Sequence, residues 1–146
     1  MSDNRRVYRT IRMALKQMYP TEPKGNTGRM LTTLAALVSG IVLGKSCQLP
    51  SIARKAPDRA KADSRVKRYS RWIQNERIDY QSYYLPFVRE LLERLAQIRE
   101  LVFVIDGSEV GQECITLMIS LIYGKRALPI TWLVVKGSKG HLPERL

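Results

Sequence analysis

The sequence is poor in the residues that build metal centres and disulfide frameworks. Among its 146 residues there are two cysteines, Cys47 and Cys114, and a single histidine, His141. Two cysteines are too few for a disulfide framework or a cysteine-rich zinc site, and they favour a reducing compartment. One histidine excludes any metal site that is built from several imidazole ligands.

Long apolar runs and targeting signals are also missing. The most apolar stretch, residues 34–43, is interrupted by Ser39 and Gly40. It has about half of the roughly 20 residues that a membrane-spanning helix needs. The N-terminus has mixed polar sequence after its arginines, where a secretory signal would have an apolar segment. We therefore expect a soluble protein without a membrane partner.

Acidic residues are few, and their scarcity is confined to one half of the chain. Lys and Arg number 25 against 13 Asp and Glu, which gives a net charge of +12. Residues 1–77 hold 17 basic and 5 acidic residues, whereas residues 78–146 hold 8 of each. Such asymmetry predicts that the first half of the chain binds a polyanion. Nucleic acid is favoured over a membrane surface, because the densest basic run lacks the broad apolar face of a membrane-binding helix.

Residues 1–99 have the pattern of a helical, basic DNA-binding region. Apolar residues recur at spacings of three and four over residues 4–18, and a nearly all-apolar helix is expected over residues 29–43. Residues 20–28 hold two prolines and two glycines and are the expected linker between these helices. A short helix is predicted to begin near Ser51, and a longer helix that ends near Asn75 follows it. Another helix is predicted to begin at Pro86.

Residues 100–146 change to the pattern of β-strands. Apolar and β-branched residues fill three runs, 101–106, 113–123 and 130–136, with glycine-containing turns between them. They predict a three-stranded antiparallel meander, in which Pro129 marks a strand start, so the expected fold class is α+β. The first two strands are apolar on both faces and need a covering layer on each. The sheet therefore looks unfinished, which indicates that the chain is a piece of something longer.

The helix that ends near Asn75 supplies the candidate DNA-binding residues. Between Arg54 and Arg77, nine Lys and Arg are accompanied by three Asp and Glu, so few cations have an acidic partner nearby. With the short helix before it, this helix could form a helix-turn-helix, and a solvated cationic surface is the alternative. Its expected buried face is Ala62, Val66, Tyr69 and Ile73, and the aromatic residues Tyr69 and Trp72 are expected to be core residues and not platforms for stacking bases. The side chains expected to face outward and contact DNA phosphates are Lys61, Arg65, Lys67, Arg68 and Arg71.

Two short glycine motifs have a structural and a functional interpretation. Gly44-Lys45-Ser46 resembles the end of a P-loop, but Ser39 stands where that motif requires a glycine, so a helix end is favoured. Asp106-Gly107-Ser108 follows the first apolar run. It is equally a hairpin turn or a carboxylate held at the end of a strand for a hard cation such as Mg²⁺. A lone Asp cannot build a two-metal site.

Several stretches carry a resemblance to a known family. Three stretches resemble insertion-sequence transposases of the DDE (Asp-Asp-Glu) class: residues 101–112, which start with Leu-Val-Phe-Val-Ile-Asp-Gly-Ser, residues 117–123 and residues 126–143. They are similar to the bacterial branch with an RNase H-like catalytic domain. Residues 70–75 and 84–87 resemble the N-terminal helical region of that branch. The resemblance covers about residues 28–146.

The resemblance implies a role for Asp106 and for the helical region. Asp106 would end the first strand of an RNase H-like sheet, as the first catalytic acid and as a ligand of two Mg²⁺ ions shared with a second Asp and a Glu. Those two acids would lie beyond residue 146, so this chain alone is expected to hold no Mg²⁺ stably and to be inactive. The helical region would bind the element's terminal inverted repeats as duplex DNA, in the cytoplasm at the nucleoid.

The residues leave three functions open. The chain is a transposase fragment, which cleaves and transfers DNA strands only in the complete protein. Alternatively, it is a catalytically dead remnant or DNA-binding regulator, whose partners include a second copy of itself or an intact transposase. A basic RNA-binding protein is the third function, and the absence of aromatic-rich strands of the RRM kind disfavours it.

Overall fold

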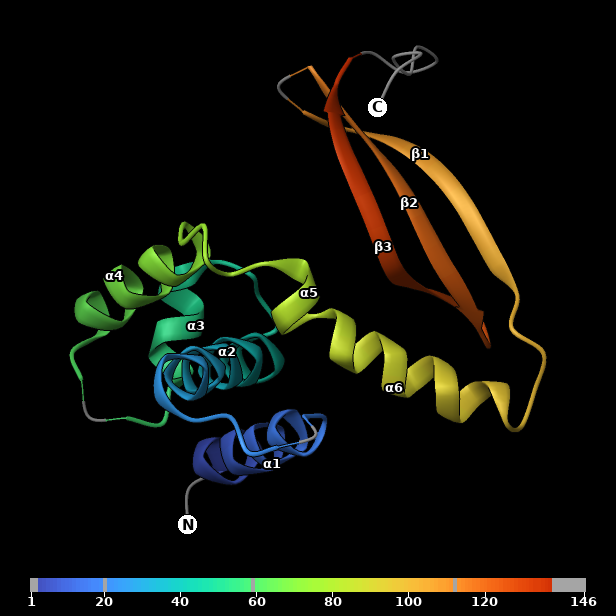
Figure 1. Cartoon of the computed structure of the whole chain (residues 1–146). Coiled ribbons are helices and arrows are strands. Elements are labelled where there is room, and N and C mark those ends of the chain that lie inside the picture. Colours follow the sequence, from blue (N-terminus) through green and yellow to red (C-terminus); the bar gives the residue numbers. More distant parts are fainter. Residues whose placement is uncertain (1–2, 20, 59, 112, 138–146) are drawn as a thin grey trace. The chain divides into compact units, whose positions relative to one another are not determined.

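The fold has a helical part followed by a sheet. A computed structural model describes residues 3–19, 21–58, 60–111 and 113–137. Within these residues, six helices precede a three-stranded antiparallel sheet, so the α+β class is confirmed (Figure 1). The chain divides into two compact units, residues 1–90 and 91–146.

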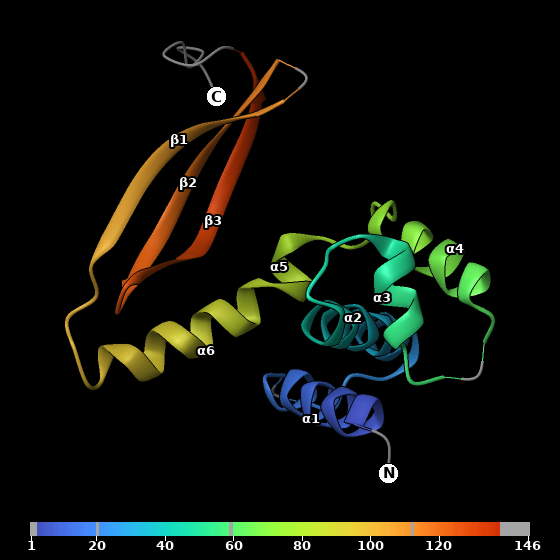
Figure 2. The ribbon, with the colours of Figure 1, turned by 180° about the vertical axis from the view of Figure 1, so that it is seen from behind.

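The helical unit is arranged around α2 (Gly25–Gly44), which contacts α1 (Asp3–Gln17), α3 (Leu49–Lys55) and α4 (Ala62–Ile73). Figures 1 and 2 show α2 between α1 on one side and α3 and α4 on the other. α2 begins four residues earlier than the sequence predicts, which shortens the expected linker. Gly25 turns the chain into this helix with a φ of +58°, a conformation that glycine adopts without steric cost.

α2 is the one helix in the described part of the chain that is long and apolar enough to cross a membrane. Length and composition are weak evidence for a membrane span, because the core helix of a globular unit has the same properties. α2 contacts three other helices, and residues such as Leu31, Ala35 and Leu37 are buried there. Its position is that of a core helix.

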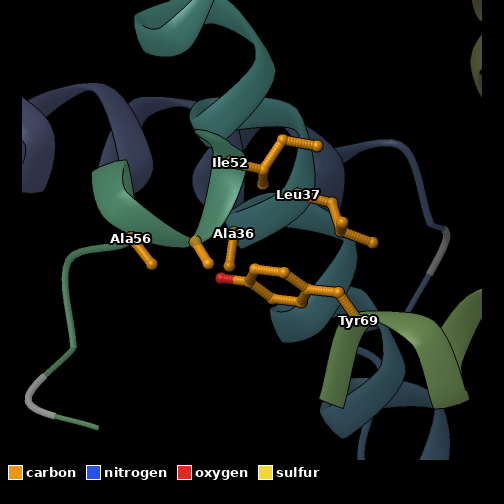
Figure 3. Close-up of a cluster of buried hydrophobic side chains, with 6 residues drawn as sticks. Ala36, Leu37, Ile52, Ala56 and Tyr69 are labelled. Carbon is orange, nitrogen blue, oxygen red and sulfur yellow. The ribbon is translucent and has the colours of Figure 1, made fainter. Parts of the chain in front are cut away.

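The core of the helical unit lies where α2, α3 and α4 meet (Figure 3). Tyr69 is fully buried, and its ring reaches from α4 to the alanines Ala36 and Ala56, whose small side chains leave space for it. Trp72 packs against the same cluster, and its indole Nε1–H donates to the Met30 carbonyl oxygen at 3.1 Å. Both aromatic residues are therefore core residues, as the sequence predicts.

The buried face of α4 is rotated from the predicted one. Ile73 is 58 % exposed and Ala62 is exposed, whereas Val66, Tyr69 and Trp72 pack on the core. The reason is geometric, because residues three apart lie on one face of a helix and this face meets α2 and α3. The prediction of Ala62 and Ile73 as buried residues is wrong.

Two more helices follow α4. Asp79 caps the short α5 (Tyr80–Tyr83), since its carboxylate accepts the backbone N–H of Ser82 at 2.6 Å. α6 (Leu85–Ala96) has Pro86 in its first turn, as predicted. Tyr19 connects this segment to the end of α1, because its hydroxyl donates to the Ser82 carbonyl oxygen at 2.5 Å and its ring meets Phe87 edge to face.

The second unit contains the predicted meander, with β1 (Phe103–Gly111), β2 (Cys114–Tyr123) and β3 (Arg126–Lys136) in the order β1-β2-β3. β1 continues past Asp106 to a turn where Gly111 and Glu113 have positive φ angles. The predicted end of the first strand at Asp106, whether as a turn or as a strand-end carboxylate, is therefore wrong. β1 is an edge strand, and all of its residues are exposed.

Pro129 lies inside β3 and does not begin it. It is opposite Ser120, where the β2–β3 register is irregular. Proline has no backbone N–H, and an edge strand with a bulge tolerates this loss. The predicted strand start at Pro129 is therefore wrong by three residues, because β3 already begins at Arg126.

Candidate nucleic-acid interface

Basic side chains of the helical unit surround three adjoining hollows, which we call the basic hollows. Their volumes are about 360, 430 and 450 Å³. Asp58 is the one acidic residue among the described residues that line them. The cations that line them are Arg5, Arg9, Arg12, Lys16, Lys24, Arg29, Arg68 and Arg71.

α2 provides the floor that the basic hollows share. Thr33 lines all three hollows, and Thr32 lines two of them. Both side chains are half-buried, and their hydroxyls donate to carbonyl oxygens one turn back along α2, at 2.8 Å for Thr32 and 3.3 Å for Thr33. This face of an otherwise apolar helix is therefore polar where α1 and α4 leave it open.

The structure places the five predicted DNA-binding residues in three different settings. Lys61 and Lys67 are exposed and line none of the basic hollows. Arg71 is exposed and lines one hollow, and Arg68 lines two of them. Arg65 differs from the prediction, because its side chain is only 12 % exposed and faces the protein.

Asp58 explains the burial of Arg65. Its carboxylate accepts Arg65 Nε–H at 2.7 Å and Arg68 Nη2–H at 2.5 Å. Arg65 also donates to the Asp58 carbonyl oxygen and, at 2.8 Å, to the Ala53 carbonyl oxygen. Arg65 therefore connects α4 to the end of α3 and to the loop between them. We call this group of ion pairs the Asp58 clamp.

The clamp shifts the ionisation of Asp58 and orients Arg68. Burial raises the pKa of Asp58, but hydrogen bonds from Arg68, Arg65 and the Ala60 backbone N–H outweigh it, so the pKa lies below its ordinary value. The Arg68 guanidinium lies over the Tyr69 ring, 5.2 Å from its centroid. Asp58 is therefore ionised at neutral pH, and it holds Arg68 at the edge of two basic hollows.

The α3–α4 pair departs from the usual helix-turn-helix. Residues 56–61 connect the two helices, whereas the usual turn in this motif has three or four residues. The basic hollows, and not a short turn before α4, are the feature that brings the cations of this unit together.

Asp106 lies in the middle of β1, opposite Met118 on β2. Ser108 Oγ–H donates to its carboxylate at 3.3 Å. Nowhere in the described residues do three or more His, Cys, Asp or Glu side chains gather in a way that could hold a metal. The residues around Asp106 therefore do not by themselves fit the two-Mg²⁺ site that the resemblance implies. His141 and the last residues of the resembling segment, 138–143, lie outside the described part.

Sequence reasoning missed the cations of α1 and the threonines of α2 as parts of the site. A signal was present, because Arg5, Arg9, Arg12 and Lys16 recur at helical spacing along one side of α1. Thr32 and Thr33 are polar residues in an apolar helix. What the sequence does not contain is the packing of α1 and α4 on opposite sides of α2.

Comparisons of this chain with protein-family models, with curated proteins and with solved structures found no match.

Proposed function

We propose that the helical unit binds the phosphate backbone of duplex DNA, as the N-terminal part of a transposase of the DDE class. One observation carries the DNA-binding part, namely that eight cations and one acid among the described residues line three adjoining hollows of a single unit. Arg and Lys gathered around a polar floor suit phosphate oxygens. The transposase part is supported by the resemblance over residues 101–143.

Salt-dependent binding tests this proposal. The full chain should bind a fluorescently labelled duplex DNA, with an affinity that falls steeply as the salt concentration rises. The reason is that protein binding releases counterions from the DNA, and a high salt concentration opposes this release. Arg71→Ala should weaken binding several-fold, since it removes a cation that lines a basic hollow. Lys55→Ala is the control, because Lys55 is exposed on α3 and lines none of these hollows.

The same titration separates the alternative functions. Equal or tighter binding of a structured RNA of the same length would favour an RNA-binding protein. Binding that does not respond to salt, or no binding to either nucleic acid, would contradict the proposal.

Catalysis is proposed only for a protein that contains further acids. The described residues do not gather a metal site, so we derive no catalytic step for this chain. In a chain extended by a second Asp and a Glu, Asp106 would contribute one carboxylate ligand to Mg²⁺. Mg²⁺-dependent nicking by such an extended chain should be lost in Asp106→Ala, and nicking that survives the substitution would refute this assignment.

A further inference from the structure

Two of the three basic hollows form a row along α1, which the sequence does not single out as a DNA-binding helix. Arg5 and Arg9 line the first hollow, and Arg12 and Lys16 line the hollow beside Lys24. From residue 5 to residue 16 the axis of an α-helix rises by about 16 Å. One DNA strand places a phosphate about every 3.4 Å along the duplex axis, so this row has the length of about five phosphates.

The first hollow has the chemistry of a phosphate subsite. Its cations, Arg5 and Arg9 of α1 and Arg68 of α4, come from opposite sides of α2. Guanidinium groups donate parallel hydrogen bonds that match two phosphate oxygens. Thr32 and Thr33 contribute the polar floor beneath them.

The acid in this hollow does not cancel its positive charge. Asp58 is held by both Arg65 and Arg68, so its carboxylate is already neutralised by two guanidinium groups. Among the residues that the structure describes, the three cations that line the hollow exceed its one acid by two charges. Asp58 therefore acts as a positioning residue, which fixes Arg68 and leaves the hollow basic.

We propose that α1 is the helix that follows the DNA backbone, with one phosphate seated between Arg5, Arg9 and Arg68 on the Thr32–Thr33 floor. This inference rests on the proposed function. It assigns the main contact to the α1 side of the hollows, whereas the sequence favours the outer face of α4. Lys67, which is exposed on α4 away from the hollows, is then peripheral.

Two neighbouring arginines provide a matched test. Arg5 lines the first hollow, whereas Arg6, the next residue, pairs with Asp3 at 3.2 Å and lines none of the basic hollows. In the full chain, Arg5→Ala should weaken binding to a labelled 30-base-pair duplex about tenfold and lower the salt slope by about one. Arg6→Ala removes the same charge from the same helix, and it should change the affinity less than about twofold.

A second pair of variants tests the floor. Thr33→Glu places a carboxylate where all three hollows meet, and Thr33→Gln places a neutral group of the same shape there. Thr33→Glu should bind the duplex at least about tenfold more weakly than Thr33→Gln, because the added charge repels phosphates. Circular dichroism of each variant shows whether the helices are retained, and the comparison between Glu and Gln is independent of any shared packing effect.

The outcomes separate this inference from the function on which it rests. If the wild-type chain binds DNA in a salt-dependent way but Arg5→Ala behaves like Arg6→Ala, the DNA lies elsewhere and the inference is wrong, while the proposed function stands. Equal binding by Thr33→Glu and Thr33→Gln overturns it as well. If the wild-type chain shows no salt-dependent binding, both the function and the inference fail.

Discussion

Gly40 determines how closely α2 and α3 approach each other. A Cβ atom at this position would lie 2.5 Å from Ile52 Cγ2 and 2.9 Å from the Ile52 carbonyl oxygen, and a backbone atom cannot move away cheaply. Gly44, one turn later on α2, has its closest neighbour at 3.6 Å, which is an ordinary contact. The two glycines therefore differ in packing, although they share a helix.

We expect Gly40→Ala to destabilise the helical unit. Alanine favours a helix over glycine by up to about 1 kcal/mol. Overpacking a close helix contact costs about 1–3 kcal/mol, so the net change is a loss of about 1–2 kcal/mol in the free energy of unfolding. Gly44→Ala is the matched control and should be neutral or slightly stabilising. Urea unfolding followed by circular dichroism measures both, and equal stabilities would show that the α2–α3 contact can relax.

At single positions of α4, the sequence predicts the aromatic core residues correctly, whereas helical periodicity misplaces Ala62 and Ile73. Tyr69 and Trp72 were predicted in the core and are there. Arg65 was predicted to face outward and instead binds Asp58, because the loop after α3 brings an acid seven residues earlier in sequence beside it. A count of charges along the chain does not contain that pairing.

At the scale of elements, the Asp58 clamp joins α3, the loop and α4. Asp58→Asn should lower the free energy of unfolding by about 1–2 kcal/mol, because Arg65 is largely buried and would lose its charged partner. The carboxylate pKa is lowered in the folded state. The stabilisation is therefore complete above the ordinary pKa of 3.8 and disappears as the pH falls through the lower folded pKa.

The pH dependence distinguishes this clamp from an ordinary surface pair. The stability difference between wild type and Asp58→Asn should be constant near neutral pH and shrink in acid, below the ordinary pKa of a carboxyl group. Asp3→Asn is the control, because Asp3 and Arg6 are both largely exposed and such pairs contribute little. A difference that persists unchanged in acid would mean that Asp58 acts through its backbone or shape and not through its charge.

Helices and strands were predicted well as elements and less well at their ends. The three strands occur in the predicted order, because apolar runs separated by glycine turns specify a meander. The end of β1 was misplaced, since Asp-Gly is a common turn pair and yet here it continues an antiparallel ladder with β2. The turn was set by Gly111 and Glu113, whose positive φ angles are a property of the folded backbone.

On the scale of the whole molecule, the sequence predicts which half carries the charge, but not how that charge is arranged. The basic excess belongs to the first half, and the structure gathers part of it around α2. The second unit differs in that it exposes apolar residues on its edge strand β1, where Phe103 is 46 % exposed and Ile105 is 65 % exposed. An exposed apolar edge strand pairs readily with another chain.

We expect the full chain to bind an apolar-sensitive dye and to associate at micromolar concentration through β1. Ile105→Lys should reduce both dye binding and association, because a charged side chain on an edge strand opposes pairing. Ile73→Lys is the matched control: Ile73 is exposed to a similar degree, at 58 %, but on a helix whose backbone is already hydrogen-bonded. Sedimentation velocity measures the association, and dye fluorescence measures the exposed apolar surface. A monodisperse wild-type monomer without dye binding, or equal effects of the two lysine variants, would contradict association through this strand.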